Sequence, residues 1–176
     1  MSAIPSLRTA RLNLRPLRPG DLDALADMLA DPEVARFIGP ERPRDRVESW
    51  RALESMLGHW AMRGYGFFAL ELRETGVFVG RAGILHPLDW PAPELAYALA
   101  RPFWGQGYAT EAAGAARAWA FDWFGFARLA SFIHPDNAAS IKVANRLGAV
   151  REGDVQLAGM TAQHWVHYPP GRGAIV

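Results

Sequence analysis

The stretch Phe103–Glu111, which reads Phe-Trp-Gly-Gln-Gly-Tyr-Ala-Thr-Glu, decides the fold. Before it, the apolar run Leu95–Leu99 is typical of a buried strand, and after it the alanine-rich segment Ala112–Phe124 predicts a helix. Gly105 and Gly107 therefore stand where a strand turns into a helix. The rest of the chain is interpreted outward from this junction.

This junction suits an anionic ligand. Glycine has no Cβ, so its backbone adopts unusual dihedrals and a ligand can approach the main chain closely. The N–H groups of the first helical turn and the positive end of the helix dipole then favour a phosphate. The pattern is not a P-loop, because no Gly-Lys-Ser/Thr closes it, and it is not a dinucleotide fingerprint, because Thr110 stands where the third glycine would be. A glycine pair that only makes a tight turn remains an alternative.

The next segment repeats the order of strand, loop and helix. Leu129–His134 predicts a second buried strand, and Asn137 and Ser140 follow it in the sequence. Ile141–Leu147 predicts a helix that ends at Gly148. The two units together are more specific than either one alone.

The segments Glu94–Ala112 and Asn137–Ala149 resemble the GNAT superfamily of acyl-CoA-dependent N-acyltransferases, and within it the RimJ/RimL-like branch. The predicted order of strand, two helices, three strands, helix, strand, helix and two strands extends this resemblance to about residues 9–168. It implies an α/β (α+β) fold in a single domain over residues 1–176. The expected sheet is mixed, mostly antiparallel, of about six to seven strands flanked by helices. The resemblance also implies a splay between two parallel central strands, Glu94–Leu99 and Leu129–His134.

The end of the chain is expected to form two last strands. They cover Ala149–Asp154 and roughly His164–Tyr168, with a loop over Leu157–Gln163 between them. Two prolines and a glycine predict another loop at Ile38–Pro43. We expect these two loops, together with His164, His167 or Tyr168, to line the acceptor pocket.

Composition excludes several other classes of function. A net charge of +1 gives no electrostatic case for a nucleic-acid partner. The absence of cysteine excludes disulfides and a cysteine acyl-enzyme. No apolar run approaches the ~18 residues of a membrane helix, and the N-terminus lacks a secretory signal, so we expect no membrane partner and a cytoplasmic location. The histidines show no metal spacing, so no metal is expected.

The resemblance also implies where acetyl-CoA binds. In GNAT enzymes the pantetheine arm lies in the splay, so main-chain groups of Leu99, Ala100 and Arg101 are expected to bond it. The pyrophosphate is expected on main-chain N–H groups of residues 104–110. The predicted cosubstrate-binding residues are Leu99, Ala100, Arg101, Trp104, Gly105, Gln106, Gly107, Tyr108, Ala109, Thr110, Asn137 and Ser140.

Amine acylation requires one group to remove a proton from the ammonium and another to serve the departing thiolate. Glu94 is the predicted base, and a strand-end surface carboxylate is the alternative. Glu111 is the rival, but we expect it to face away, because it would repel phosphate from the helix start. Many GNAT enzymes place a tyrosine where this chain has Ala144. The resemblance to the RimJ/RimL-like branch implies instead that Ser140 serves the thiolate and that Asn137 orders the loop and bonds the pantetheine arm. The alternative for Ser140 is a helix cap.

The resulting hypothesis is transfer of an acetyl group from acetyl-CoA to a primary amine by direct attack in a ternary complex. The acceptor is either a protein N-terminus, such as a ribosomal-protein alanine, or a small amine. The alternative is a non-catalytic acyl-CoA-binding regulatory module, which needs the glycines but neither Glu94 nor Ser140. The oligomeric state stays open, a homodimer included.

Overall fold

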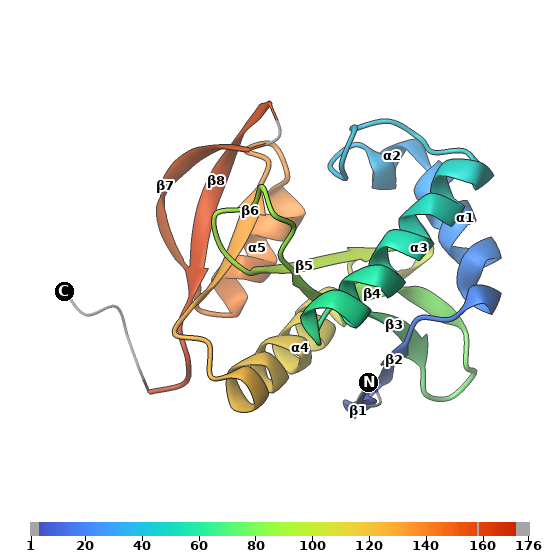
Figure 1. Cartoon of the computed structure of the whole chain (residues 1–176), viewed down its shortest axis with the longest axis horizontal. Helices are drawn as coiled ribbons and strands as arrows, with labels where there is room; N and C mark the ends of the chain where they lie inside the picture. Colours follow the sequence, from blue (N-terminus) through green and yellow to red (C-terminus); the bar gives the residue numbers. More distant parts are fainter. Residues whose placement is uncertain (1–3, 158, 172–176) are drawn as a thin grey trace.

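An eight-stranded sheet with helices on both faces forms the centre of the computed structural model, which describes residues 4–157 and 159–171 (Figure 1). The strands are β1 (Leu7–Arg8), β2 (Leu12–Pro16), β3 (Phe67–Leu72), β4 (Phe78–Leu85), β5 (Glu94–Leu99), β6 (Leu129–Ile133), β7 (Val150–Leu157) and β8 (Met160–His167). Their spatial order is β1-β2-β3-β4-β5-β6-β8-β7. Only the β5–β6 pair is parallel.

The helices are α1 (Leu22–Ala30), α2 (Pro32–Ala35), α3 (Arg46–Arg63), α4 (Tyr108–Phe124) and α5 (Ala138–Arg146), with 3-10 turns at Pro19–Asp21 and Arg101–Phe103. Local sequence sets their limits. In α3, the Asp45 side chain accepts from the Glu48 N–H and Glu48 accepts from the Asp45 N–H, which is a capping box. Gly64 ends this helix with a left-handed φ of 75°. Among the described residues, no helix is long and apolar enough to cross a membrane.

The sheet separates two apolar layers. On one face, α1 and α3 cover small residues of β5, Ala96 and Ala98, together with Phe67 and Ala69 of β3. On the other face, α4 packs its alanines against β4 and β5, and α5 packs against β6 and β8. Because side chains alternate along a strand, Leu95 and Leu99 enter the α4 layer while Glu94 shares the α1–α3 face. Figure 1 shows β5 and β6 in the middle of this arrangement.

The mixed, mostly antiparallel sheet with one central parallel pair is confirmed. It has one strand more than the upper expected number, because β1 is too short to leave a pattern in the sequence. The predicted loop over Leu157–Gln163 is wrong, since β7 extends to Leu157 and β8 begins at Met160. Most of β7 is solvent-exposed at the sheet edge, so it lacks the apolar alternation that reveals a half-buried strand.

Candidate functional site

A splay opens between β5 and β6. The two strands pair at one position only, Glu94 with Ala130, where the Ala130 N–H donates to the Pro93 carbonyl at 2.8 Å. Beyond this apex, toward the carboxyl ends of both strands, no further pair joins them. The opening therefore runs from Glu94 toward the loop that begins after Leu99.

Side chains supply hydrogen bonds to main-chain groups that have no partner on the neighbouring strand, because the strands separate at the splay. The Ser131 hydroxyl donates to the Leu95 carbonyl at 2.7 Å, and the Phe132 N–H donates to a Glu94 carboxylate oxygen at 3.3 Å. The Trp104 indole donates to the Leu99 carbonyl at 2.8 Å. These contacts stabilise the separated strands, because buried polar groups without partners cost free energy.

The main-chain groups that face the opening differ in part from those expected. The Ala100 N–H donates to the Val79 carbonyl of β4, and its carbonyl accepts from Phe103. Antiparallel pairing directs alternate peptide groups of β5 toward β4, so those of Tyr97 and Leu99 point toward β6. The Leu99 carbonyl already accepts a hydrogen bond from Trp104. The N–H groups of Tyr97 and Leu99 are therefore the donors that β5 offers at this edge.

The glycine loop lies at the carboxyl end of β5. Gly105 and Gly107 have φ values of 73° and 85°, in the left-handed region that favours glycine. A Cβ on Gly105 would meet no atom within 4 Å, so the loop is open above this residue. Gly107 is the N-cap of α4 and offers no capping side chain. The Thr110 hydroxyl, in the first turn of α4, is buried without a partner among the described residues. This arrangement fits an incoming phosphate acceptor.

Two arginines near this loop are already engaged. The Arg101 Nε lies 2.9 Å from a carboxylate oxygen of Asp31, which caps α2, so its charge is paired. Arg11 donates from Nη1 to the Gln106 carbonyl at 2.9 Å and from Nε to Glu111 at 2.7 Å. The loop therefore presents main-chain groups more than free side-chain charge.

Glu111 is held away from the splay by the β1–β2 turn. Its carboxylate accepts from the Thr9 hydroxyl at 2.6 Å and from the Arg11 main-chain N–H at 2.8 Å. Burial would raise the pKa of Glu111, but these hydrogen bonds outweigh it, and the pKa lies below its ordinary value. A carboxylate that is paired and ionised in this way is a structural anchor and a poor base.

Glu94 lies at the apex of the splay and is 9% exposed. One carboxylate oxygen accepts from the Trp90 indole N–H at 2.6 Å, and the other accepts from the Phe132 N–H. Burial raises the pKa of Glu94 to about 7, against these hydrogen bonds and the positive charge of Arg81. A carboxylate that titrates near neutrality is suited to accept a proton and release it again.

We expect Glu94→Gln to flatten the pH dependence of stability. The raised pKa means that the folded protein keeps this proton from about pH 4.5 to pH 7, where the unfolded chain has lost it. The free energy of unfolding of the wild type therefore falls across this window, by up to about 3 kcal/mol, and the glutamine variant lacks this fall. Urea unfolding at both ends of the window measures the difference.

The change with pH, not the absolute stability, is the readout. Glutamine offers one oxygen to the two donors Trp90 and Phe132, so the variant loses a hydrogen bond at every pH. Glu54→Gln, at an exposed position of α3, is the matched control and should keep the wild-type slope. Equal slopes in wild type and Glu94→Gln would contradict the raised pKa.

Asn137 and Ser140 lie at the start of α5, on the α4 side of the sheet. Asn137 is the N-cap, and its side-chain oxygen accepts from the Ser140 N–H at 3.1 Å. The capping alternative therefore belongs to Asn137. The Ser140 side chain is partly exposed, and its hydroxyl has no hydrogen bond to the described residues. The Tyr97 hydroxyl of β5 donates to the Ser140 carbonyl at 3.2 Å, which ties α5 to β5 across the splay.

The face of the sheet that carries Glu94 continues across β6 onto β8. Phe132 lies two residues past Ala130, the partner of Glu94, and pairs with His164 in register. Glu94, Phe132 and His164 therefore share one face of the sheet. The Phe132 and His164 rings stack with centroids 5.3 Å apart. Of the side chains expected at the acceptor pocket, His164 lies here, whereas His167 is buried on the other face against Ser131.

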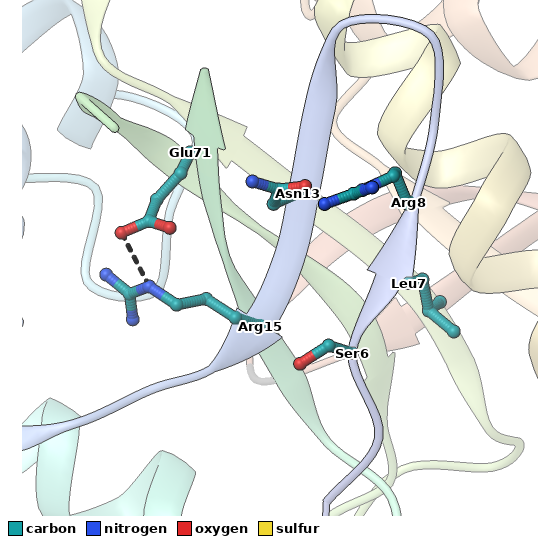
Figure 2. Close-up of a pocket in the computed structure, with 6 residues that line it drawn as sticks. All are labelled: Ser6, Leu7, Arg8, Asn13, Arg15 and Glu71. Carbon is teal, nitrogen blue, oxygen red and sulfur yellow. Dashed lines mark ion pairs between the residues drawn. The ribbon is translucent and has the colours of Figure 1, made fainter. Parts of the chain in front are cut away.

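A separate pocket of about 280 Å³ opens at the β1 edge of the sheet (Figure 2). Its lining residues are Ser6, Leu7, Arg8, Asn13, Arg15 and Glu71. Figure 2 shows Arg15 and Glu71 paired, with 2.7 Å between Nε and the carboxylate oxygen. The pocket lies at the far edge from the splay, so we place the candidate site at the splay. The described residues contain no group of three or more side chains that could hold a metal ion.

The chain belongs to the GNAT acetyltransferase family, because the model of the acetyltransferase (GNAT) domain matches residues 11–150. It is 33% identical over 156 residues to the protein YkkB of Bacillus subtilis (strain 168), covering 84% of this chain and 87% of YkkB. An acetyltransferase from Agrobacterium tumefaciens str. C58 is 34% identical and superimposes with a TM-score of 0.86 over 96% of this chain and 97% of its own. RimL, solved in complex with coenzyme A, shares the fold at 19% identity and a TM-score of 0.75, over 91% of this chain and 95% of its own.

Several residues at the site were not identified from the sequence. Trp90 lies in a proline-rich segment that carries no pattern, and its bond to Glu94 depends on how that segment folds back. Tyr97 is part of an apolar strand and gave no separate signal. Arg81 did leave a signal, because it is the one charged residue within the apolar run of β4.

Proposed function

We propose that the protein transfers an acetyl group from acetyl-CoA to a primary amine, by direct attack within a ternary complex. One observation carries this proposal. The splay between β5 and β6 joins an open glycine loop at its wide end to a buried carboxylate with a pKa of about 7 at its apex. A thioester held along the splay would bring its acyl group near that carboxylate.

The chain supplies donors along the whole length of such a ligand. N–H groups of β5 face the opening, and the loop at Gly105 and Gly107 leads into the first turn of α4. The helix dipole and unpaired N–H groups at this end favour a pyrophosphate, by typically ~0.3–1 kcal/mol for the dipole. Acetyl-CoA supplies an activated acyl group and a thiol leaving group.

Glu94 accepts the proton that an ammonium must lose before its nitrogen can act as a nucleophile. The nitrogen then forms a bond with the thioester carbonyl carbon, and the bond from carbon to sulfur breaks. The sulfur leaves with the electron pair and takes up one proton. We assign the group that serves this thiolate to Ser140. The amine loses two protons in total, so one proton is released to water.

The acceptor is a protein N-terminus or a small amine. Release of free thiol from acetyl-CoA, measured over a panel of N-terminal peptides and small primary amines, tests the proposal. Turnover with at least one amine is expected, together with the acetylated product by mass spectrometry. Binding of acetyl-CoA without transfer to any amine would instead favour a regulatory acyl-CoA-binding module.

Gly105→Val is expected to weaken CoA binding at least tenfold, which corresponds to about 1.4 kcal/mol. The valine side chain would project from the glycine loop, where no protein atom lies within 4 Å and where the phosphates are proposed to sit. Calorimetric titration with CoA measures the change.

Gly125→Val is a matched control for this variant. Gly125 ends α4 with a left-handed φ of 62° and open space around it, so valine there meets similar backbone strain. We expect normal CoA affinity in the folded Gly125→Val protein. Unchanged affinity in folded Gly105→Val would exclude the glycine loop as the phosphate site.

A further inference from the structure

Arg81 is a charged side chain that the proposed reaction does not use. Its guanidinium carbon lies 4.2 Å from the centroid of the Phe67 ring, and its Nη1 lies 3.3 Å from the Met56 sulfur, a weak acceptor. Its Nε is buried and has no hydrogen-bond partner in the described part of the chain. Arg81 also forms no ion pair with the described residues. The guanidinium is thus packed but not electrically compensated.

Such an arrangement is costly in the free protein. A charge that is partly withdrawn from water and lacks an ion-pair partner carries a desolvation cost. Burial, with the positive charge of Arg44, lowers the pKa of Arg81 to about 10 against the opposing charge of Glu94. Arg81 therefore remains charged at neutral pH. An anionic group brought by a ligand would compensate this charge.

The position of Arg81 relates it to the candidate base. Arg81 pairs with Ala98 of β5, on the same face as Ala96 and Glu94. Its contact with Phe67 of β3, which pairs with Gly83 two residues further along β4, shows that the side chain leans along β4 to the level of Ala96, on the β3 side. The residues of β5 between the two charges on this face are alanines. These alanines are small and only partly buried, so a ligand extended along this face of β5 would contact them.

A second arginine lies on this side of the site. Arg44 precedes α3, is half-buried, and forms no ion pair with the described residues. Its guanidinium packs against Gly39, in the loop between α2 and α3. Burial lowers the pKa of Arg44, and its charge adds to that of Arg81. The region next to Glu94 is therefore positive on one side.

We propose that Arg81 binds a carboxylate of the acceptor, so that the substrate is a primary amine that also carries an acidic group. The inference rests on the proposed function and specifies its substrate class. The guanidinium presents a planar pair of N–H donors that matches a carboxylate. The amine end of the same molecule then reaches Glu94. Arg81 lies opposite Ala98, four residues from Glu94 on β5, and four residues along a strand span roughly 13 Å, which favours an amine and an acid separated by several bonds.

The test compares amino acids with their amides. Glycine, β-alanine, 4-aminobutyrate and 6-aminohexanoate are each paired with the corresponding amide, which keeps the amine and removes the negative charge. For the best chain length, we expect the wild type to show at least tenfold higher kcat/KM with the acid than with its amide. Arg81→Met should lose this preference, mainly through a higher KM for the acid, when acid and amide are compared in the same variant at one pH.

Methionine keeps the packing of the unbranched side chain against Phe67 and Met56, so the variant is expected to fold. Arg81→Lys is a second variant, which keeps the charge and loses the planar pair of donors. Arg51→Met, at an exposed position of α3, is the control for net charge and should behave as the wild type.

A binding readout does not depend on turnover. The N-acetylated acids should raise the melting temperature of the wild-type protein saturated with CoA, and should not raise that of Arg81→Met. Equal use of acids and amides, or no thermal shift with any N-acetylated acid, would overturn acid recognition alone. A protein that binds no CoA would overturn the proposed function as well.

Discussion

Glu94→Gln is expected to lower kcat by about 10²–10⁴-fold, the range for loss of a positioned general base. The wild-type rate should rise with pH through about 7, as the buried carboxylate loses its proton. The variant should lack this rise and recover part of its activity only at high pH, where the amine is deprotonated in solution. Steady-state rates with a saturating amine, measured from about pH 5 to pH 10, give the two profiles.

Two measurements separate a base from a structural residue in this experiment. CoA affinity of Glu94→Gln should be close to that of the wild type, because the carboxylate acts on the acceptor side of the splay. Glu111→Gln removes the carboxylate that Thr9 and Arg11 already hold, so it should keep the rise near pH 7. A Glu94→Gln enzyme with a near-normal rate and profile would rule out Glu94 as the base.

Ser140→Ala is expected to lower kcat by about 10²-fold, the lower end of the range for positioned proton transfer. Its loss should persist at high pH, because the missing proton belongs to the departing thiolate and not to the amine. The helix start should survive, since Asn137 caps it through the Ser140 main-chain N–H. The same pH series, run beside Glu94→Gln, measures the contrast between the two profiles.

Tyr97→Phe is the matched control for Ser140→Ala. It keeps the serine hydroxyl and removes only the hydrogen bond from Tyr97 to the Ser140 carbonyl, worth about 0.5–1.5 kcal/mol of stability. A small change in kcat is expected from this variant. If Ser140→Ala and Tyr97→Phe lower kcat equally, the placement of the start of α5, and not the Ser140 hydroxyl, would explain the effect of Ser140→Ala.

Much of the fold follows from short-range patterns. An apolar stripe at helical spacing predicts α3 with its end before Gly64, and the alanine-rich segment Ala112–Phe124 predicts α4. The strand, glycine loop and helix around Gly105 are local in the same way. The parallel neighbours β5 and β6 followed from the family resemblance, since no local signal states which strands pair.

The prediction from sequence failed where the local pattern was weak, or where the residues in contact lie far apart in the sequence. The solvent-exposed β7 has no apolar alternation, and a loop is predicted over Leu157–Gln163 where β7 ends at Leu157 and β8 begins at Met160. The hydrogen bonds of Glu111 join α4 to Thr9 and Arg11, about a hundred positions away in the sequence. The sequence predicted only that Glu111 faces away from the phosphate site, not which residues hold it. Contacts of this kind depend on sheet order and register, which a single sequence does not state.

The sequence by itself determined the chemistry at hand: a glycine loop at a strand-to-helix junction, a glutamate at the start of a central strand, and no cysteine to carry an acyl group. Only the tertiary structure decided the environment of that glutamate. Burial in the folded protein raises the pKa of Glu94 to about 7, against the hydrogen bonds from the Trp90 indole and the Phe132 N–H, which lower it. Desolvation and charge act through space, between segments that are distant in the sequence. The guanidinium of Arg81, which lies on the same face without an ion pair among the described residues, depends on the tertiary structure in the same way.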